Sequence, residues 1–309
     1  MVKLLDGLDA DPSQAALTER FLLPALPALE TFFLAVRAQT DAALASRIGA
    51  QYGKAYPYGS CLEITSDVMW RLGAREAWSD MPGAQALKAF LDHGGEGRML
   101  WGVLRESYFQ NAIQLGTLYV DVSNDTVDVR KPKVEILPMK DSGFALVRDA
   151  AHFVRIGEAY WNARLYVNTA LPSLAPAFPM ILVDRDGKVG LMARVRYVME
   201  MFANDGFRLA EQWLREGPAP PVEAVHSLRS LCSRELLAAN PRTGVGAAVG
   251  ACEQLRAAGV IGDNAWIDAM FAAFDKAPTA RLASRSFRGI LDERRANSRP
   301  LAGIAKLSA

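Results

Sequence analysis

The sequence contains few of the residues that most often carry catalysis or bind transition metals. Among 309 residues there are three cysteines and three histidines. The cysteines, Cys61, Cys232 and Cys252, are odd in number and far apart, so they predict neither a disulfide framework nor a thiolate metal site. No His-x-Asp or His-x-Glu pair occurs, which argues against a mononuclear iron site. We therefore expect no metal or other cofactor, and a reducing, cytoplasmic setting.

Long uninterrupted apolar runs are also missing. The N-terminal residues 1–14, MVKLLDGLDADPSQ, become acidic too early for a signal peptide. The apolar stretch over residues 21–36 is broken by Pro24, Pro27 and Glu30, so we expect no segment that spans a membrane. Half of the residues are hydrophobic and 22% are charged, which is typical of a globular protein with a large core.

Positive charge is concentrated at the C-terminal end. Residues 281–309, which we call the basic tail, carry seven basic and two acidic side chains, whereas the whole chain has a net charge of only +1. The tail is therefore +5 and the remainder is −4. Such a segment binds an acidic or phosphate-bearing partner, or it is a solvated arm that contributes to solubility.

Hydrophobic periodicity changes twice along the chain. Apolar residues recur at helical spacing over residues 14–49, and again in a helix that starts at Cys61 and one from Gly83 to His93. Residues 98–192 change to the period of two that is typical of strands, and helical spacing returns after Met192. This order predicts an α+β fold with a central, mostly antiparallel sheet flanked by N-terminal and C-terminal helices.

The same patterns predict three parts of the chain. We expect an α+β core domain over residues 1–217, a C-terminal helical subdomain over residues 218–280, and then the basic tail. The sequence PAPP, Pro218–Pro221, makes a short stiff linker at the first of these boundaries. Helices of the subdomain are expected near residues 226–239, 246–258 and 264–274.

The clearest strand pair surrounds a turn at Gly116–Thr117. A two-residue turn there pairs Leu115 with Leu118 and Ile113 with Val120, which gives one apolar face. The opposite face then carries the polar side chains Gln110, Gln114, Tyr119 and Asp121. Further strands are expected within residues 133–139 and 143–147 and in a hairpin over residues 179–195.

Cys61 stands at the start of a predicted helix. Ser60 and Glu63 have the spacing of a capping box, which makes Cys61 the first helical residue. A thiol there faces unpaired N–H groups and the positive end of the helix dipole, and both favour the thiolate. This is the environment that a cysteine nucleophile needs.

The alternative is that Cys61 is a packed core residue. It belongs to an apolar stripe at helical spacing, and a buried cysteine on such a stripe is inert. Glu63 also opposes a thiolate by its charge. The other members of the stripe are Thr65, Val68, Met69 and Leu72.

The residues GSC at a helix start, followed by a histidine that begins a segment with strand character, resemble the papain-like cysteine hydrolase superfamily. The resemblance covers about a dozen residues. It implies that Cys61 is the nucleophile and His152 the base, that Asn162 orients the imidazole, and that Gln51 serves the oxyanion. It also implies acyl hydrolysis or acyl transfer on a small-molecule or peptide substrate. Candidate substrate-binding residues are Gln51, Tyr58, Gln110 and Asp121.

The segment that carries His152 has two interpretations. Residues 152–168, HFVRIGEAYWNARLYVN, are compatible with two strands around Glu158–Ala159, and residues 149–165 are equally compatible with a helix. The position of Asn162 relative to His152 depends on which of the two forms.

Residues 110–122, QNAIQLGTLYVDV, suggest a related family. In transglutaminase-like and arylamine N-acetyltransferase enzymes, a histidine and an aspartate stand on neighbouring strands at about this place. The matching position here holds Asn111 and not histidine, which implies that the base is lost while Asp121 remains. The sequence therefore leaves two functions open: a cysteine-dependent acyl hydrolase or transferase, and a non-catalytic binding or adaptor protein in which Cys61 is packed.

Two further motifs have simple structural explanations. Asp184 and Asp186 in VDRDG suit a metal or a sugar nucleotide, but an Asp-Gly pair more often makes a hairpin turn. Gly244, Gly246 and Gly250 have a dinucleotide-like spacing, but they follow a helical stretch and not a strand. For these glycines we expect a helix capped by Thr243, with small residues for close packing.

Overall fold

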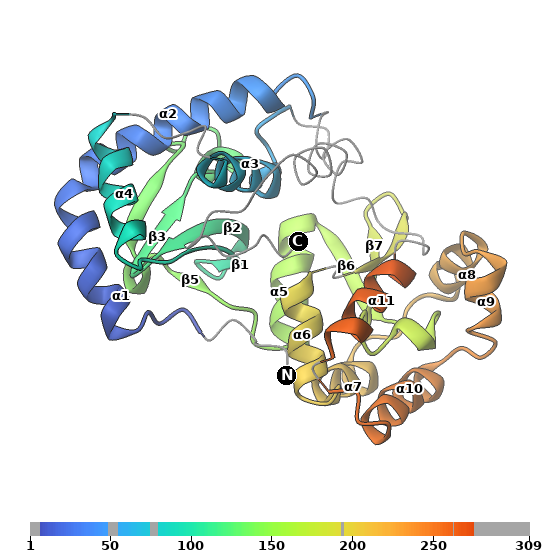
Figure 1. Cartoon of the computed structure of the whole chain (residues 1–309). Coiled ribbons are helices and arrows are strands. Elements are labelled where there is room, and N and C mark those ends of the chain that lie inside the picture. Colours follow the sequence, from blue (N-terminus) through green and yellow to red (C-terminus); the bar gives the residue numbers. More distant parts are fainter. Residues whose placement is uncertain (1–6, 49–54, 75–79, 193–194, 262, 275–309) are drawn as a thin grey trace. The chain divides into compact units, whose positions relative to one another are not determined.

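A computed structural model describes residues 7–48, 55–74, 80–192, 195–261 and 263–274 (Figure 1). The contacts between residues divide this part of the chain into two compact units. The first unit is Leu8–Ala145, and the second unit is the described chain from Leu146 onward. The boundary predicted after residue 217 lies inside the second unit, and the basic tail lies outside the described residues.

Helices form the N-terminal part of the first unit. Asp11 caps the first of them by accepting a hydrogen bond from the Gln14 N–H at 2.9 Å. Pro24 and Pro27 each lack an N–H group, and the helical run changes to π and 3-10 geometry just before and at Pro24. The elements are α1 Pro12–Leu17, η1 Thr18–Leu22, η2 Leu23–Ala25, α2 Leu26–Leu44, α3 Cys61–Gly73 and α4 Pro82–Asp92.

The first unit also contains a five-stranded antiparallel sheet. Its strand order is β4-β3-β2-β1-β5. The register pairs Leu115 with Leu118 and Ile113 with Val120, as the sequence predicted, and Gly116 takes the turn with a φ of 55°. The strands are β1 Gly97–Leu104, β2 Tyr108–Leu115, β3 Leu118–Asp121, β4 Glu135–Pro138 and β5 Phe144–Ala145, with short helical turns η3 Asn124–Thr126 and η4 Met139–Asp141.

Helices α2, α3 and α4 cover the apolar face of this sheet. Ile113 and Val120 are buried there with Leu29 and Phe33 of α2 and Val68 of α3. This confirms the predicted apolar face of the hairpin. The opposite face is also covered, because the ring of Tyr119 packs against Phe144 with centroids 5.6 Å apart.

The run Pro12–Leu44 is long and apolar enough to cross a membrane, judged by length and composition alone. A core helix can meet the same two criteria. Within this run, α2 buries Leu29, Phe32 and Phe33 in the core of the first unit.

The second unit has its own small sheet and the remaining helices of the described chain. Its three strands are antiparallel in the order β6-β7-β8. Phe178 and Phe274 meet in its core, with ring centroids 4.5 Å apart. The elements are α5 Ala150–Trp161, β6 Ala163–Val167, η5 Pro172–Leu174, β7 Met180–Asp184, β8 Val189–Met192, α6 Arg196–Asn204, α7 Arg208–Glu216, α8 Val222–Ser230, α9 Arg234–Ala238, α10 Val245–Ala257 and α11 Asn264–Phe274.

The α+β fold class is confirmed, with one difference in organisation. The antiparallel strands form two sheets, one in each unit, and not a single central sheet. The helical stretch expected after Met192 is also divided, because Gly206 and Phe207 have φ values of 69° and 63°. Left-handed backbone cannot continue a right-handed helix, so α6 and α7 are separate.

Candidate functional site around Cys61

Cys61 is the first residue of α3, as predicted, but the predicted capping box does not form. Ser60 is the N-cap residue, yet its side chain makes no capping hydrogen bond. Its Oγ instead lies 3.4 Å from the Tyr58 carbonyl oxygen. The Glu63 side chain is buried, with 2% of its surface exposed. The helix start therefore lacks the reciprocal pair that the sequence suggested.

The sulfur of Cys61 has an amide as its hydrogen-bond partner. Asn111 on β2 donates from Nδ2 to Sγ at 3.3 Å. The backbone of Asn111 is held in turn, because its carbonyl oxygen accepts from the hydroxyls of Thr65 and Ser123, both at 3.2 Å. The packing of α3 over β2 therefore places an amide beside the thiol, at the position that the second family resemblance assigns to histidine.

The electrostatic environment keeps this thiol protonated. Burial is the main cause that raises the pKa of Cys61 to about 11; hydrogen bonding to Asn111 lowers it, and the neighbouring charges of Glu63 and Asp121 add to the rise. Burial likewise raises the pKa of Glu63 to about 7. The helix N-terminus does not offset these effects, so the protonated thiol is favoured at neutral pH.

The polar face of the hairpin is a buried hydrogen-bond cluster. Asp121 is fully buried, and its Oδ2 accepts from Gln110 Nε2 at 2.7 Å and from the Tyr119 hydroxyl at 3.1 Å. Its Oδ1 accepts from the Ser123 N–H at 2.8 Å and from the Ser123 hydroxyl at 3.1 Å. Gln110 and Asp121 thus lie on one face, as predicted, and they hydrogen-bond to each other inside the unit, where Gln110 Oε1 is buried without a hydrogen-bond partner among the described residues.

Ser123 connects the two faces of the sheet. Its hydroxyl contacts Asp121 Oδ1, the Asn111 carbonyl oxygen and, at 3.3 Å, the hydroxyl of Thr65 on α3. A continuous polar network therefore runs from Tyr119 and Asp121 to the residue that holds the Cys61 sulfur. Asp121 does not bond to the Asn111 side chain, so the network supports the strand and does not form a catalytic triad.

His152 lies in a helix of the second unit. The segment forms α5 and not two strands, and Asp149 caps it by accepting from the His152 N–H at 2.7 Å. The imidazole is buried, and its Nδ1 accepts from the Arg148 N–H at 3.3 Å. Asn162 ends the helix in left-handed conformation, with a φ of 49°.

The role suggested for Asn162 does not fit this helix. Ten residues separate Asn162 from His152, which places their backbones about 15 Å apart along the axis of α5. Hydrogen-bonded atoms lie about 3 Å apart, so the side chains of Asn162 and His152 cannot form a direct hydrogen bond across that separation. The hairpin interpretation of this segment is wrong, because residues 150–161 form a helix that Asp149 caps.

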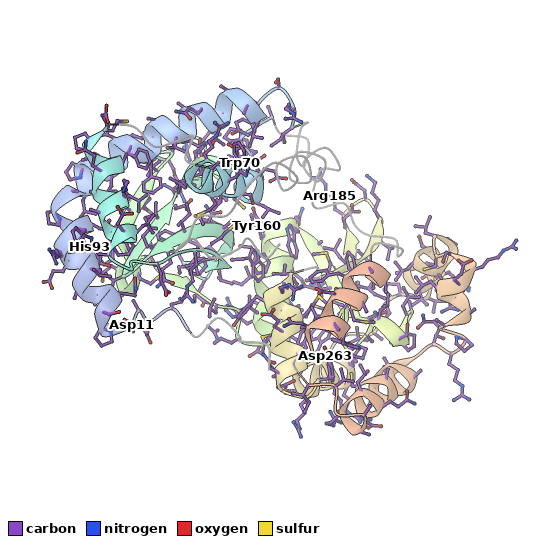
Figure 2. The ribbon with its side chains drawn as sticks, in the orientation of Figure 1. Asp11, Trp70, His93, Tyr160, Arg185 and Asp263 are labelled. Carbon is purple, nitrogen blue, oxygen red and sulfur yellow. The ribbon has the colours of Figure 1, made fainter. Side chains whose placement is uncertain are left out.

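The other sequence candidates are distributed over both units. Cys61 and His152 belong to different units, and Gln51 lies outside the described residues. Tyr58 is half-buried in the turn before Cys61, where its N–H donates to the Ala55 carbonyl oxygen at 3.1 Å. The single histidine of the first unit, His93, lies at the end of α4, with Nδ1 2.8 Å from the Ala89 carbonyl oxygen (Figure 2).

The acidic pair in the second hairpin has a structural role. Asp184 Oδ1 accepts from the N–H groups of Asp186 and Lys188, each at 2.8 Å, and so closes the turn between β7 and β8. This agrees with the turn interpretation. Among the described residues, no group of three or more His, Cys, Asp or Glu side chains could hold a metal ion.

The glycine-rich segment begins a helix but is not closely packed. Gly244 is the N-cap of α10, with a φ of 102°, so the expected cap at Thr243 is wrong. A Cβ added at Gly246 or Gly250 would meet no atom within 4 Å, so the expected close packing is also wrong. The segment follows α9 and not a strand, so the context of a dinucleotide fingerprint is missing.

Sequence reasoning missed the buried charge cluster around Arg37. This fully buried side chain donates to Asp125 Oδ1 at 2.7 Å, to Asp41 Oδ1 at 2.8 Å and to the Val122 carbonyl oxygen at 2.8 Å. It fixes the loop that follows β3, next to Ser123. The sequence did contain a sign of this cluster: Arg37 stands four residues after Phe33, so it lies on the apolar, buried face of α2.

Comparison with protein-family models, curated proteins and solved structures finds no match to this chain.

Proposed function

We propose that this chain is a non-catalytic binding or adaptor protein, in which Cys61 is a packed structural residue. The observation that carries the proposal is the hydrogen bond from Asn111 Nδ2 to the Cys61 sulfur. An amide nitrogen donates and cannot take up the thiol proton, whereas a cysteine nucleophile needs a base that accepts it. Among the described hydrogen bonds, the Cys61 sulfur therefore has no partner that can accept its proton.

Two properties of the same site support the proposal. Burial raises the pKa of Cys61 to about 11, so the thiolate is a very small fraction of the population at neutral pH. The hydrophobic residues that follow Cys61 on its stripe, Val68, Met69 and Leu72, are all buried in the core of the first unit. We infer that the site resembles a transglutaminase-like arrangement from which the base has been lost, with Asp121 kept for its hydrogen bonds to the strand.

The competing function is a cysteine-dependent acyl hydrolase or transferase, with Cys61 as nucleophile and His152 as base. The two proposals differ in the acidity of the thiol. Cys61 and Cys232 are both partly buried. We expect iodoacetamide to label Cys61 at pH 7 no faster than Cys232, with a rate that keeps rising with pH beyond about 8.5, the value for a free thiol. Peptide mass spectrometry of labelled full-length protein resolves the cysteines, and Cys61→Ser identifies the Cys61 peptide.

The pH midpoint is the decisive readout, because limited access slows labelling without moving the midpoint. A midpoint for Cys61 below about 8.5 would contradict the binding-protein proposal.

A second experiment measures acyl transfer directly. A panel of activated esters and thioesters is assayed with wild type, Cys61→Ser and His152→Ala, alongside the melting temperature of each. We expect the three proteins to turn over these esters equally slowly. An enzyme would instead lose its activity in both variants to a similar extent, because nucleophile and base act as a unit.

A further inference from the structure

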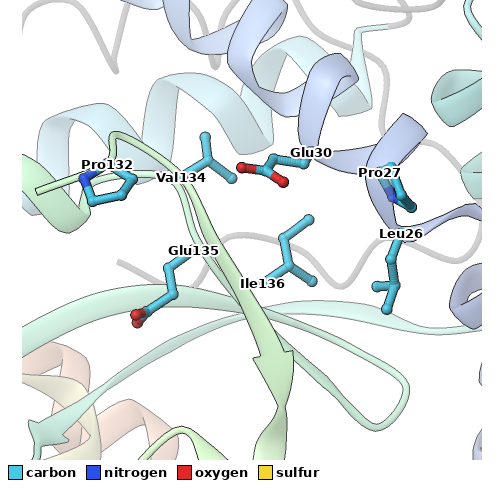
Figure 3. A pocket seen from close by; sticks show the side chains of 7 residues that line it. All are labelled: Leu26, Pro27, Glu30, Pro132, Val134, Glu135 and Ile136. Carbon is cyan, nitrogen blue, oxygen red and sulfur yellow. The ribbon is translucent and has the colours of Figure 1, made fainter.

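The first unit contains an open groove beside the edge of its sheet. The groove has a volume of about 300 Å³ and lies between the start of α2 and β4 (Figure 3). Its lining combines apolar side chains with the two glutamates Glu30 and Glu135. The lining residues are Leu26, Pro27, Glu30, Pro132, Val134, Glu135 and Ile136.

The strand beside the groove is the last of its sheet. β4 pairs with β3 on one side and has no strand on the other among the described residues. An edge strand presents backbone donors and acceptors in a row, and an extended segment can add to it while placing alternate side chains in a neighbouring groove. The shape and position of this groove therefore suit an extended peptide.

The charge of the groove indicates which peptide. Glu135 is paired with Arg105 at 2.8 Å, whereas Glu30 is exposed and makes no ion pair in the described structure. The first unit as a whole, residues 8–145, contains 17 acidic and 13 basic side chains and is therefore −4. Residues 146–280 contain 14 of each and are neutral. The first unit is thus the acidic part of the chain.

The basic tail is opposite in charge to Glu30 and to the first unit as a whole. Two basic side chains near the groove, Lys133 and Arg105, are already paired with Asp41 and Glu135. The tail has a net charge of +5, and it has apolar residues between its arginines, at Phe287, Ile290 and Leu291. The described chain ends at Phe274, and the 35 residues that follow can extend over about 115 Å, so length does not restrict what the tail reaches.

We propose that the groove between α2 and β4 binds the basic tail of the same chain, with an arginine beside Glu30. A covalently attached segment has a high effective concentration, so it competes well with the same segment of another molecule. The contact reduces binding of the tail to an acidic or phosphate-bearing partner, because that partner must compete with the first unit for the tail. The proposal does not depend on the role of Cys61.

Carbodiimide coupling tests the proposal in the full-length protein. This reagent joins a carboxylate to an amine that it contacts, and Lys306 is the only lysine in the basic tail. We expect a peptide that joins Glu30 or Glu135 to Lys306, at a yield that is independent of protein concentration. Glu30→Lys should lower the yield and the tail's occupancy about tenfold, whereas Glu19→Lys, an exposed charge reversal outside the groove lining, should not.

Hydrogen exchange provides a readout that does not depend on where Lys306 lies. We expect backbone amides of residues 134–137 to exchange about tenfold more slowly in wild type than in a variant with Arg285, Arg288, Arg294 and Arg295 changed to glutamine. High salt should remove this difference, because it screens an exposed ionic contact.

Two outcomes would overturn the proposal. Cross-links that form only between isotopically distinct molecules would identify a second copy as the occupant. The second outcome combines two results: the tail substitutions do not change exchange at residues 134–137, and no cross-link to the groove forms. The tail would then be a solvated arm.

Discussion

Gln110 and Asp121 share a hydrogen bond inside the first unit, with Nε2 of the amide 2.7 Å from Oδ2 of the carboxylate. Tyr119 and Ser123 supply the remaining donors, and no cation contacts the carboxylate among the described hydrogen bonds and ion pairs. Burial therefore outweighs these hydrogen bonds and raises the pKa of Asp121 to about 6. A carboxylate in this state links folding to pH.

The first prediction concerns that linkage. The pKa of Asp121 is about 6 in the folded protein, and its ordinary value, taken for the unfolded chain, is 3.8. Between pH 3.8 and pH 6 the folded protein therefore binds more protons than the unfolded chain. The contribution of Asp121 to stability is complete below about pH 4 and is lost as the pH rises through 6. Relative to Asp121→Asn, wild type should lose on the order of 3 kcal/mol between pH 4 and pH 7, measured by urea unfolding.

Two variants test whether this effect has the assigned cause. Glu63→Gln should also flatten the pH dependence, over a range that extends to about pH 7, since burial raises the pKa of Glu63 as well. Asp128→Asn should act in the opposite direction, because the Arg130 guanidinium lowers the pKa of that exposed carboxyl. If Asp121→Asn leaves the pH dependence of unfolding unchanged, Asp121 does not titrate in this range.

The second prediction concerns the register of the hairpin. Val120 is buried on the apolar face beneath α2, α3 and α4, so Val120→Asp places a charge in the core without a partner and should prevent folding. Val129→Asp is the matched control, because Val129 is 49% exposed and its substitution should cost less than about 0.5 kcal/mol. Circular dichroism and a melting curve compare the two, and equal tolerance would contradict the register.

The third prediction concerns the amide beside the thiol. Asn111→His places an imidazole near the Cys61 sulfur, where it can accept the proton and pair with the thiolate. We expect the pKa of Cys61 to fall and its labelling by iodoacetamide at pH 7 to rise at least about tenfold. Asn111→Leu removes the donor without adding a base and should raise the pKa further. Faster labelling in both variants would indicate loosened packing and not a restored base.

Local patterns predicted much of this architecture because they depend on neighbours in the sequence. The turn at Gly116, the strand over residues 135–138 and the hairpin closed by Asp184 follow from period-two alternation and turn residues. The start of α3 at Cys61 was also predicted correctly, although the capping box on which that prediction rested does not form. These elements need no knowledge of distant contacts.

The parts that were wrong or missed depend on long-range contacts. Ser60 and Glu63 have the spacing of a capping box, but the Glu63 carboxylate is buried and the box is absent. The partner of Cys61 lies 50 positions away, and the partner of Arg37 lies 88 positions away. Hydrophobic periodicity predicts which face of a helix or strand is buried. It does not predict which other helix or strand packs against that face, so these pairs could not be predicted.

The fourth prediction tests the ion cluster at Arg37. Arg37→Met should destabilise the first unit by about 3–5 kcal/mol, because it leaves Asp125, which is buried, without its cation. Arg130→Met, which removes an exposed ion pair with Asp128, should have a far smaller effect, because solvent screens that pair. Urea unfolding measures both. Similar small losses would mean that solvent reaches the Arg37 cluster.

The last prediction separates a glycine required by packing from one that is not. At Gly83 in α4, an added Cβ would lie 2.1 Å from the Ala28 carbonyl oxygen and 2.9 Å from the Leu29 Cα, and neither backbone atom can turn aside as a side chain would. Gly83→Ala must therefore push α4 away from α2, at a cost of about 1–3 kcal/mol. At Gly250 in α10 an added Cβ meets nothing within 4 Å, so Gly250→Ala should gain about 0.5–1 kcal/mol from helix propensity alone. Thermal melting of the two variants gives opposite signs if α2 and α4 pack as described. A stabilising Gly83→Ala would require a wider separation of these helices, and with it a different shape for the groove that begins at Leu26.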